Sequence, residues 1–202
     1  MKSLPLRHGL RAAAAWSALA ISHGLQAGSL TANFDDGLPP NGSTTYANTI
    51  VETTDGFTGG ALKLVKNING QQGSLVIEDL DAGSPVNSFN ATFKARVGGG
   101  TTPPADGWSF CFASDLPNGP WGEEGVGSGL SIAFDLYDNA GGEAPAITVR
   151  WNNQQIAEVK PGINPLTTGE NGSPVWADVQ IKLDPDGSLD IVFDGVAHFT
   201  NL

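Results

Sequence analysis

Oxygen-bearing side chains occur at every second position near the end of an apolar run in the middle of the chain. They are Asp135, Tyr137 and Asn139, and the acidic, glycine-rich segment Asp138–Glu143 continues from them. Because alternate residues of a β-strand point to the same face, we expect these groups to gather where a strand meets a loop. Oxygen ligands from such a place suit calcium. A loop of this composition can also tie itself together through hydrogen bonds.

The sequence offers little else for nucleophilic or zinc chemistry. Beyond residue 27 the only histidine is His198, and the only cysteine is Cys111. A serine–histidine–aspartate site would have to use His198, which lies near the chain end in an apolar hairpin. A zinc site of histidine and cysteine ligands cannot be assembled within one chain. Cys111 stands among aromatic residues, so we expect it to be a buried packing residue.

Two strand-like runs would position the acidic loop. In Trp108–Ala113 every second residue is aromatic, and in Leu130–Tyr137 large apolar residues alternate with smaller and polar ones. A glycine-rich, acidic loop joins the two runs. Runs of this kind are typical of strands inside a stack of two sheets.

Strand-like runs recur through residues 28–202, with turn residues between them and few amphipathic helical periods. This pattern predicts an all-β fold, a two-sheet antiparallel β-sandwich, in one domain. Clean alternation in Ser88–Val97 and Val175–Leu183 predicts outer strands with one wet face. The remaining expected strands are Ser29–Phe34, Thr49–Glu52, Ala61–Lys66, Ser74–Glu78, Ala146–Trp151, Gln154–Val159, Ser188–Phe193 and Val196–Thr200.

Residues 1–27 are typical of a secretory signal peptide. Lys2, Arg7 and Arg11 form a basic start, Ala12–Ile21 is a short apolar run, and Ala27 is a small residue for cleavage. The apolar run is too short to span a bilayer. We therefore expect a secreted protein, extracellular or periplasmic, without a membrane span. An uncleaved anchor or an amphipathic N-terminal helix is the alternative.

The chain after the predicted signal is strongly acidic. The whole sequence has 10 Lys and Arg and 21 Asp and Glu, and the signal takes three basic residues and no acidic ones. Residues 28–202 therefore keep 7 basic and 21 acidic residues, a formal charge of −14. Nucleic acids and anionic membranes bind Lys and Arg, so we expect neither as a partner. The charge suits calcium or simple solubility.

Three segments in order resemble the legume-type (L-type) lectins of the concanavalin A-like lectin/glucanase superfamily. They are Ala105–Asp106–Gly107, Gly127–Ser128–Gly129–Leu130 and the run IAFDLYDN at Ile132–Asn139. The opening segment Asn33–Gly37 also resembles bacterial laminin-G-like, jelly-roll modules. The resemblance implies a concanavalin A-like jelly roll, with residues 28–202 as a lectin-like domain.

The resemblance also implies sugar contacts for named residues. In the lectins the aspartate of the first segment accepts hydrogen bonds from sugar hydroxyls, often after a cis peptide bond, and here this is Asp106. A glycine of the second segment donates a backbone N–H to the same sugar, which implies Gly127 or Gly129. The asparagine of the metal loop contacts the sugar too, and Asn139 matches it.

For calcium, the resemblance implies four ligand residues on the strand end and the loop. Asp135 supplies its carboxylate, Tyr137 its backbone carbonyl and Asn139 its side-chain oxygen. A further loop acid completes the shell, and Glu143 or Asp138 is available. The cofactor implied is Ca²⁺.

The chain departs from the superfamily at two kinds of site. The lectins hold a transition metal with an acid where this chain has Ala133 and a histidine where it has Ala146, so calcium alone is implied. The glycoside hydrolases carry glutamate–x–aspartate–x–x–glutamate on one strand, and the matching residues here are Ala133, Asp135 and Asp138. Because alanine stands at the nucleophile position, we expect that the protein is not an enzyme.

These observations predict a secreted, calcium-assisted carbohydrate-binding module whose partners are glycans or polysaccharides. Asp106 and Asn139 would floor its pocket, with Trp108 or Trp121 near the rim. The alternative is a structural or adhesive β-sandwich without a glycan site, and a glycoside hydrolase is less favoured. The chain stops at Leu202, directly after a predicted hairpin strand, whereas the lectins continue. We therefore expect either a missing final strand or an exposed sheet edge.

Overall fold

The computed structural model of the chain describes residues 27–81, 83–163, 166–170 and 173–202. The described part is an all-β structure whose sheets are antiparallel throughout. The predicted signal peptide, apart from Ala27, lies outside the described residues. Within the described residues, no helix is long and apolar enough to cross a membrane.

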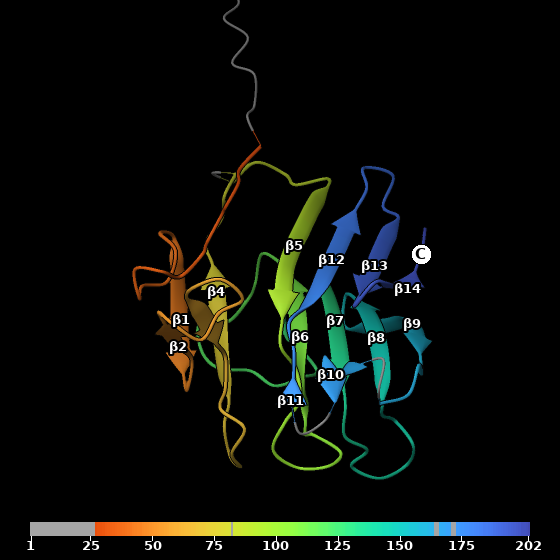
Figure 1. The fold of residues 1–202 in the computed structure, drawn as a ribbon. Coiled ribbons are helices and arrows are strands. Elements are labelled where there is room, and N and C mark those ends of the chain that lie inside the picture. The colour runs from red at the N-terminus through yellow and green to blue at the C-terminus, as the bar shows by residue number, and fades with distance from the viewer. Residues whose placement is uncertain (1–26, 82, 164–165, 171–172) are drawn as a thin grey trace, which may run out of the picture.

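Two four-stranded sheets form the body of the molecule (Figure 1). Sheet I has the order β14-β13-β12-β5, with β5 at Phe89–Ala95, β12 at Ala177–Leu183, β13 at Leu189–Phe193 and β14 at Val196–Phe199. Sheet II has the order β6-β7-β8-β9, with β6 at Gly107–Phe112, β7 at Leu130–Asp135, β8 at Ala146–Trp151 and β9 at Gln154–Val159. Each sheet is therefore built mainly from consecutive strands, and β5 is the strand that joins sheet I from earlier in the chain.

The inward faces of the two sheets form one hydrophobic core, which confirms the predicted sandwich. Phe134 of sheet II and Phe193 of sheet I are both fully buried, with ring centroids 5.7 Å apart. Trp108 stacks on Phe134 at 4.0 Å. Fully burying an aromatic or aliphatic side chain contributes about 1.5–3 kcal/mol, so this layer of alternate residues supplies much of the stability of the fold.

Three small sheets complete the described structure. Their strands are β1 (Ser43–Ala47) with β4 (Gly73–Ile77), β2 (Ile50–Glu52) with β3 (Ala61–Lys63), and β10 (Gly169–Glu170) with β11 (Ser173–Pro174). The first two lie to one side of the sandwich, beside β5 (Figure 1). Asp55, between β2 and β3, joins the second of these sheets to the end of β5, because its carboxylate lies 2.7 Å from Arg96 and 2.9 Å from Lys63.

Both sheets have an edge strand on the same side, β14 in sheet I and β9 in sheet II. Each edge pairing contains a register shift, between Ile191 and Val192 and between Val149 and Arg150. Such irregularities bend an edge and hinder its pairing with another chain. The backbone of Leu202 exchanges two hydrogen bonds with Leu189, each 3.2 Å, so the last residue is tied beside β13.

The predicted strand at Ser29–Phe34 is wrong, and β1 was not predicted. The first segment has no sheet partner, Phe34 takes a φ of 62°, and Asn33 accepts a hydrogen bond from the backbone of Asp35. These are features of a turn that a polar side chain stabilises. β1 has few apolar residues, and it forms a strand because it pairs with β4.

Candidate functional site

The pairing of β6 with β7 places Asp106 beside the end of β7. Gly107 pairs with Asp135, and the backbone N–H of Leu136 donates to the carbonyl of Asp106 at 2.8 Å. The peptide bond between Ala105 and Asp106 is cis, the geometry that the resemblance implies there. A Cβ on Gly107 would collide with the carbonyl oxygen of Phe134. The glycine after Asp106 is therefore required for the close approach of the two strands.

Asp135 lies on the opposite face of β7 from the core and is only 5% exposed. Its Oδ1 accepts a hydrogen bond from the backbone N–H of Tyr137 at 3.2 Å. Burial is the main cause that raises the pKa of this carboxyl to about 6, against the Tyr137 hydrogen bond, and the charges of Glu123, Glu124 and Glu143 raise it further. The strand end therefore holds a buried acid that titrates near neutral pH.

The carboxylates of the following loop bind the loop's own backbone. Glu143 Oε1 accepts the N–H of Asn139 at 2.6 Å and of Ala140 at 3.3 Å. Asp138 accepts the N–H of Ala140 at 3.0 Å and of Gly142 at 3.1 Å. A hydrogen bond with Glu143 is the main cause that lowers the pKa of Asp138. The loop is therefore tied together by its own hydrogen bonds, as its composition allows beside calcium binding.

The four predicted calcium ligands have suitable atom types, and two of them are engaged with the loop itself. The side-chain amide nitrogen of Asn139 points at the Tyr137 carbonyl oxygen, 3.4 Å away, and Glu143 is engaged by two N–H groups. No group of three or more His, Cys, Asp or Glu side chains that could hold a metal occurs in the described ranges. Calcium therefore stays a prediction.

The structure does not bring Gly127 and Gly129 to Asp106. Leu130 pairs with Phe112, whereas Gly107 pairs with Asp135, so the two glycines lie at the opposite end of the β6–β7 pair. Five strand positions separate the ends, a span of about 17 Å at about 3.3 Å each. One sugar ring cannot contact both Asp106 and these glycines.

The loop between β6 and β7 returns across the outer face of sheet II. We call residues Gly122–Gly129 the crossing segment. Ser109 Oγ donates to the Gly122 carbonyl and Ser131 Oγ to the Glu124 carbonyl, both at 3.0 Å. The backbone N–H of Val126 donates to Cys111 Sγ at 3.3 Å. Cys111 therefore lies under this segment, and it is half-buried where the sequence predicted a buried packing residue.

The direction of the crossing segment brings Glu123 to the Asp106 end. A Cβ on Gly107 would lie 3.1 Å from the Cβ of Glu123. The sequence does not predict this position, because nothing in a glycine-rich loop shows which way it runs. Glu123, Asp135 and the exposed Asp106 are the carboxyls that the fold gathers here.

Of the two tryptophans expected at the rim, Trp108 is placed differently. Trp108 is part of the core, stacked on Phe134, so it cannot line a sugar pocket there. Trp121 is half-buried in the loop. Trp176, which follows β11, has the guanidinium of Arg96 over its ring at 5.1 Å, so one of its faces is already covered.

No protein-family model matches this chain, and no curated protein sequence matches it.

Proposed function

We propose that this protein is an exported, non-enzymatic carbohydrate-binding domain that holds a neutral saccharide at the Asp106 end of sheet II. The observation that carries the proposal is the hydrogen bond from Leu136 N to Asp106 O, at 2.8 Å. It holds Asp106, the aspartate for which the resemblance implies sugar contact, beside the end of β7, from which the loop with Asn139 continues. The sandwich would then be a concanavalin A-like jelly roll, the fold form that the resemblance implies.

The chemistry of this end suits hydroxyl groups. Asp106 and Asn139 are both exposed, so a ligand can reach their oxygens. A hydroxyl that donates to a carboxylate makes a charge-assisted hydrogen bond, which is shorter and stronger than a neutral one. Glu123 and Glu143 add negative charge nearby, which disfavours anionic sugars and favours neutral ones.

Calcium is not part of the proposed binding, and its effect is tested in the experiment. A calcium ion bound through Glu143 Oε1 would have to compete with the N–H groups of Asn139 and Ala140, which both donate to that oxygen. The buried Asp135 would be the first ligand to test, because a cation beside it would favour its ionised form.

A glycan-array screen of the exported chain, run with calcium and again with chelator, tests the proposal. We expect binding of neutral glycans, weakened about tenfold or more by Asp106→Asn, which corresponds to about 1.4 kcal/mol. Asp186→Asn is the matched control, since Asp186 is also an exposed turn aspartate, bonded only to Ser188 on the far hairpin. Binding lost with chelator would add calcium to the site.

Two outcomes would replace the proposed function. Absence of binding in both buffers, from a sample shown to be folded, would favour a structural or adhesive module. Release of reducing sugar from a bound polysaccharide, abolished by Asp135→Asn, would show a hydrolase. Appearance of the protein in a cytoplasmic fraction alone would contradict export.

A further inference from the structure

A polar cavity of about 190 Å³ lies on the outer face of sheet II, at the end away from Asp106. The crossing segment forms one wall, through Glu124 and Gly127. Arg150 at the end of β8 and Asn153 in the β8–β9 turn form the other, and Ser131 of β7 contributes to the lining. None of these residues belongs to the Asp106 site.

The cavity offers donors and acceptors without net charge. The Arg150 side chain is 26% exposed, and its Nη2 lies 2.5 Å from Glu124 Oε2. Its Nη1 also donates to the Glu124 carbonyl at 3.4 Å. The side-chain amide of Asn153 makes no hydrogen bond with any described residue, so both its donor and its acceptor are free. An isolated anion would compete with Glu124, and a cation with Arg150.

The walls are built to stay in place. Ser128 N donates to Asp115 Oδ1 at 2.8 Å, which fixes the turn of the crossing segment. A Cβ on Gly127 would lie 2.9 Å from both Ala113 Cβ and Leu116 Cδ2, and one on Gly129 would collide with the Phe112 carbonyl. These glycines are needed for close packing, and their backbone then lines the cavity. A preformed site loses little ordering entropy on binding.

We propose that this cavity binds a single neutral sugar ring, as a second site that is independent of Asp106. Vicinal hydroxyls both donate and accept, which matches a paired arginine and glutamate with a free amide. The volume is below the range of about 300–1,000 Å³ typical of drug-sized ligands, so one ring is the size that fits. The acidic chain, at −14 after the predicted signal, repels anionic ligands.

The test uses ¹⁵N-labelled protein titrated with methyl glycosides of glucose, mannose and galactose at millimolar concentrations. We expect amide shifts at Gly125–Gly129 and Asn153 with at least one glycoside. Asn153→Gly removes the amide and keeps a residue that accepts the φ of 60°. It should weaken this binding by about fivefold. Asn152→Gly is the matched control in the same turn, with a φ of 51°, and should leave it unchanged.

The outcomes separate this proposal from the proposed function. Shifts at the cavity that persist in Asp106→Asn support an independent site, even if the array shows no binding at Asp106. Shifts around Asp106 alone would overturn the second site and leave the proposed function standing. Shifts that Asn153→Gly does not weaken, or that sodium acetate reproduces as strongly as a glycoside, would overturn the neutral-sugar assignment.

Discussion

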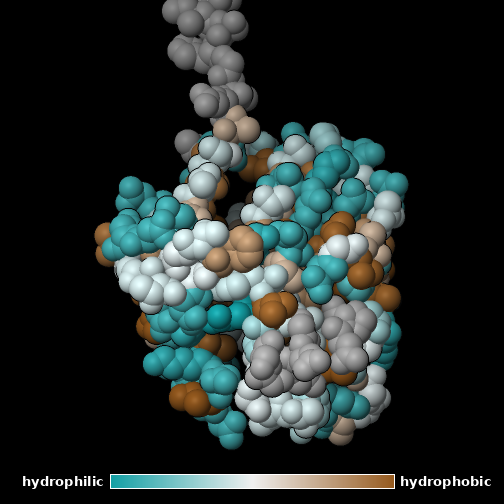
Figure 2. Space-filling view, viewed as in Figure 1, coloured by the Kyte–Doolittle hydropathy of each residue, from teal (hydrophilic) through white to brown (hydrophobic). Residues whose placement is uncertain are grey.

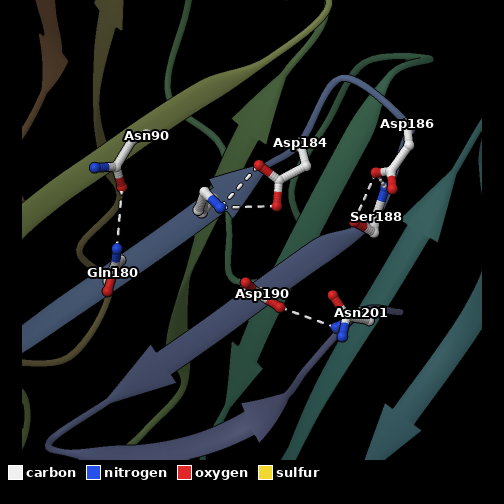
Figure 3. A network of polar contacts seen from close by, with 8 residues as sticks. Asn90, Gln180, Asp184, Asp186, Ser188, Asp190 and Asn201 are labelled. Atoms are coloured by element: carbon white, nitrogen blue, oxygen red, sulfur yellow. Dashed lines mark hydrogen bonds and ion pairs between the residues drawn. The ribbon is translucent and has the colours of Figure 1, made fainter.

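The polar groups on the outer faces of the two sheets find their hydrogen-bond partners in different ways. On sheet I, long polar side chains bond to one another or to the nearby backbone, as Figure 3 shows: Asn90 with Gln180 at 3.4 Å, Lys182 with Asp184 at 2.8 Å, and Asp190 with the N–H of Asn201 at 2.9 Å. Over the region of β5, β12 and β13, Figure 2 shows hydrophilic residues intermixed with small hydrophobic groups. This face is open and lies against water.

On sheet II, the outer face carries small residues and the chain itself covers it. Ser109, Cys111 and Ser131 hydrogen-bond to the backbone of the crossing segment. Small side chains let the backbone approach, and a cavity remains between the crossing segment on one side and Arg150 and Asn153 on the other. The cavity therefore lies on the covered face and the exposed Asp106 site at one end of sheet II, whereas polar side chains on the open face already have partners.

The largest effect should come from a methyl group placed under the crossing segment. Gly125 has a φ of +76°, and a Cβ there would collide with Ser131 Oγ and lie 2.8 Å from Cys111 Sγ. Gly125→Ala combines left-handed backbone strain with overpacking, so we expect a loss of about 2–5 kcal/mol in the free energy of unfolding. Urea denaturation measures the loss, and faster modification of Cys111 by a thiol reagent would show that the segment has lifted.

Gly187→Ala is its counterpart on the open face. Gly187 has a φ of +89° in the β12–β13 turn, with nothing within 4 Å of the added Cβ. Only the strain of the backbone remains, and we expect a loss of about 1–2 kcal/mol with no change at Cys111. Equal losses for both variants would mean that the crossing segment is not held against sheet II.

The pH dependence of stability should follow Asp135. Its pKa is raised by burial to about 6 in the folded protein, from an ordinary value of 3.8. The folded state therefore binds more protons than the unfolded state between these values, and stability falls as pH rises from about 4 to 6. Asp135→Asn resembles the neutral acid, and its Oδ1 can still accept the N–H of Tyr137. We expect the variant to match the wild type at pH 4 and to be more stable by about 1–3 kcal/mol at pH 7.

The wild type and Asp135→Asn are compared by urea denaturation at pH 4, 5, 6 and 7. Because both proteins contain the other carboxyls, the contributions of those groups to the pH dependence cancel in the difference. The measurement is made in chelator, so that a bound cation does not favour the ionised form. A variant that is less stable than the wild type at pH 7 in chelator would show that Asp135 is not the destabilised acid that its burial indicates.

Much of the sandwich could be predicted because its strands alternate. The bounds of β8 and β9 agree with the expected Ala146–Trp151 and Gln154–Val159. Most inward residues of β5 and β12 pack on the core as expected, but Phe93 is exposed. Alternation reports which face is buried. It says nothing about a strand such as β1, whose partner, and not its own pattern, makes it a strand.

The site could be predicted only in part, for a related reason. Asp106 was expected near the loop that carries Asn139, and the antiparallel pairing of two adjacent strands places it beside the end of β7, where that loop begins. The path of the β6–β7 loop decides the positions of Gly127, Gly129 and Glu123. A loop has no repeating pattern of apolar residues from which its path could be predicted. The loop returns across the sheet, and this return puts Glu123 where a glycine was expected.

The smallest effect should come from the side-chain pairs on the open face. The Asn90–Gln180 hydrogen bond is 3.4 Å long and exposed (Figure 3), so water replaces it readily. We expect Gln180→Ala to change the free energy of unfolding by less than about 0.5 kcal/mol. On the covered face, Ser131 is 5% exposed and its Oγ donates to the Glu124 carbonyl, so Ser131→Ala should cost about 1–2 kcal/mol. Urea denaturation measures both changes in the free energy of unfolding. A larger loss for Gln180→Ala than for Ser131→Ala would show that the side-chain pairs of sheet I stabilise the protein more than the contacts under the crossing segment.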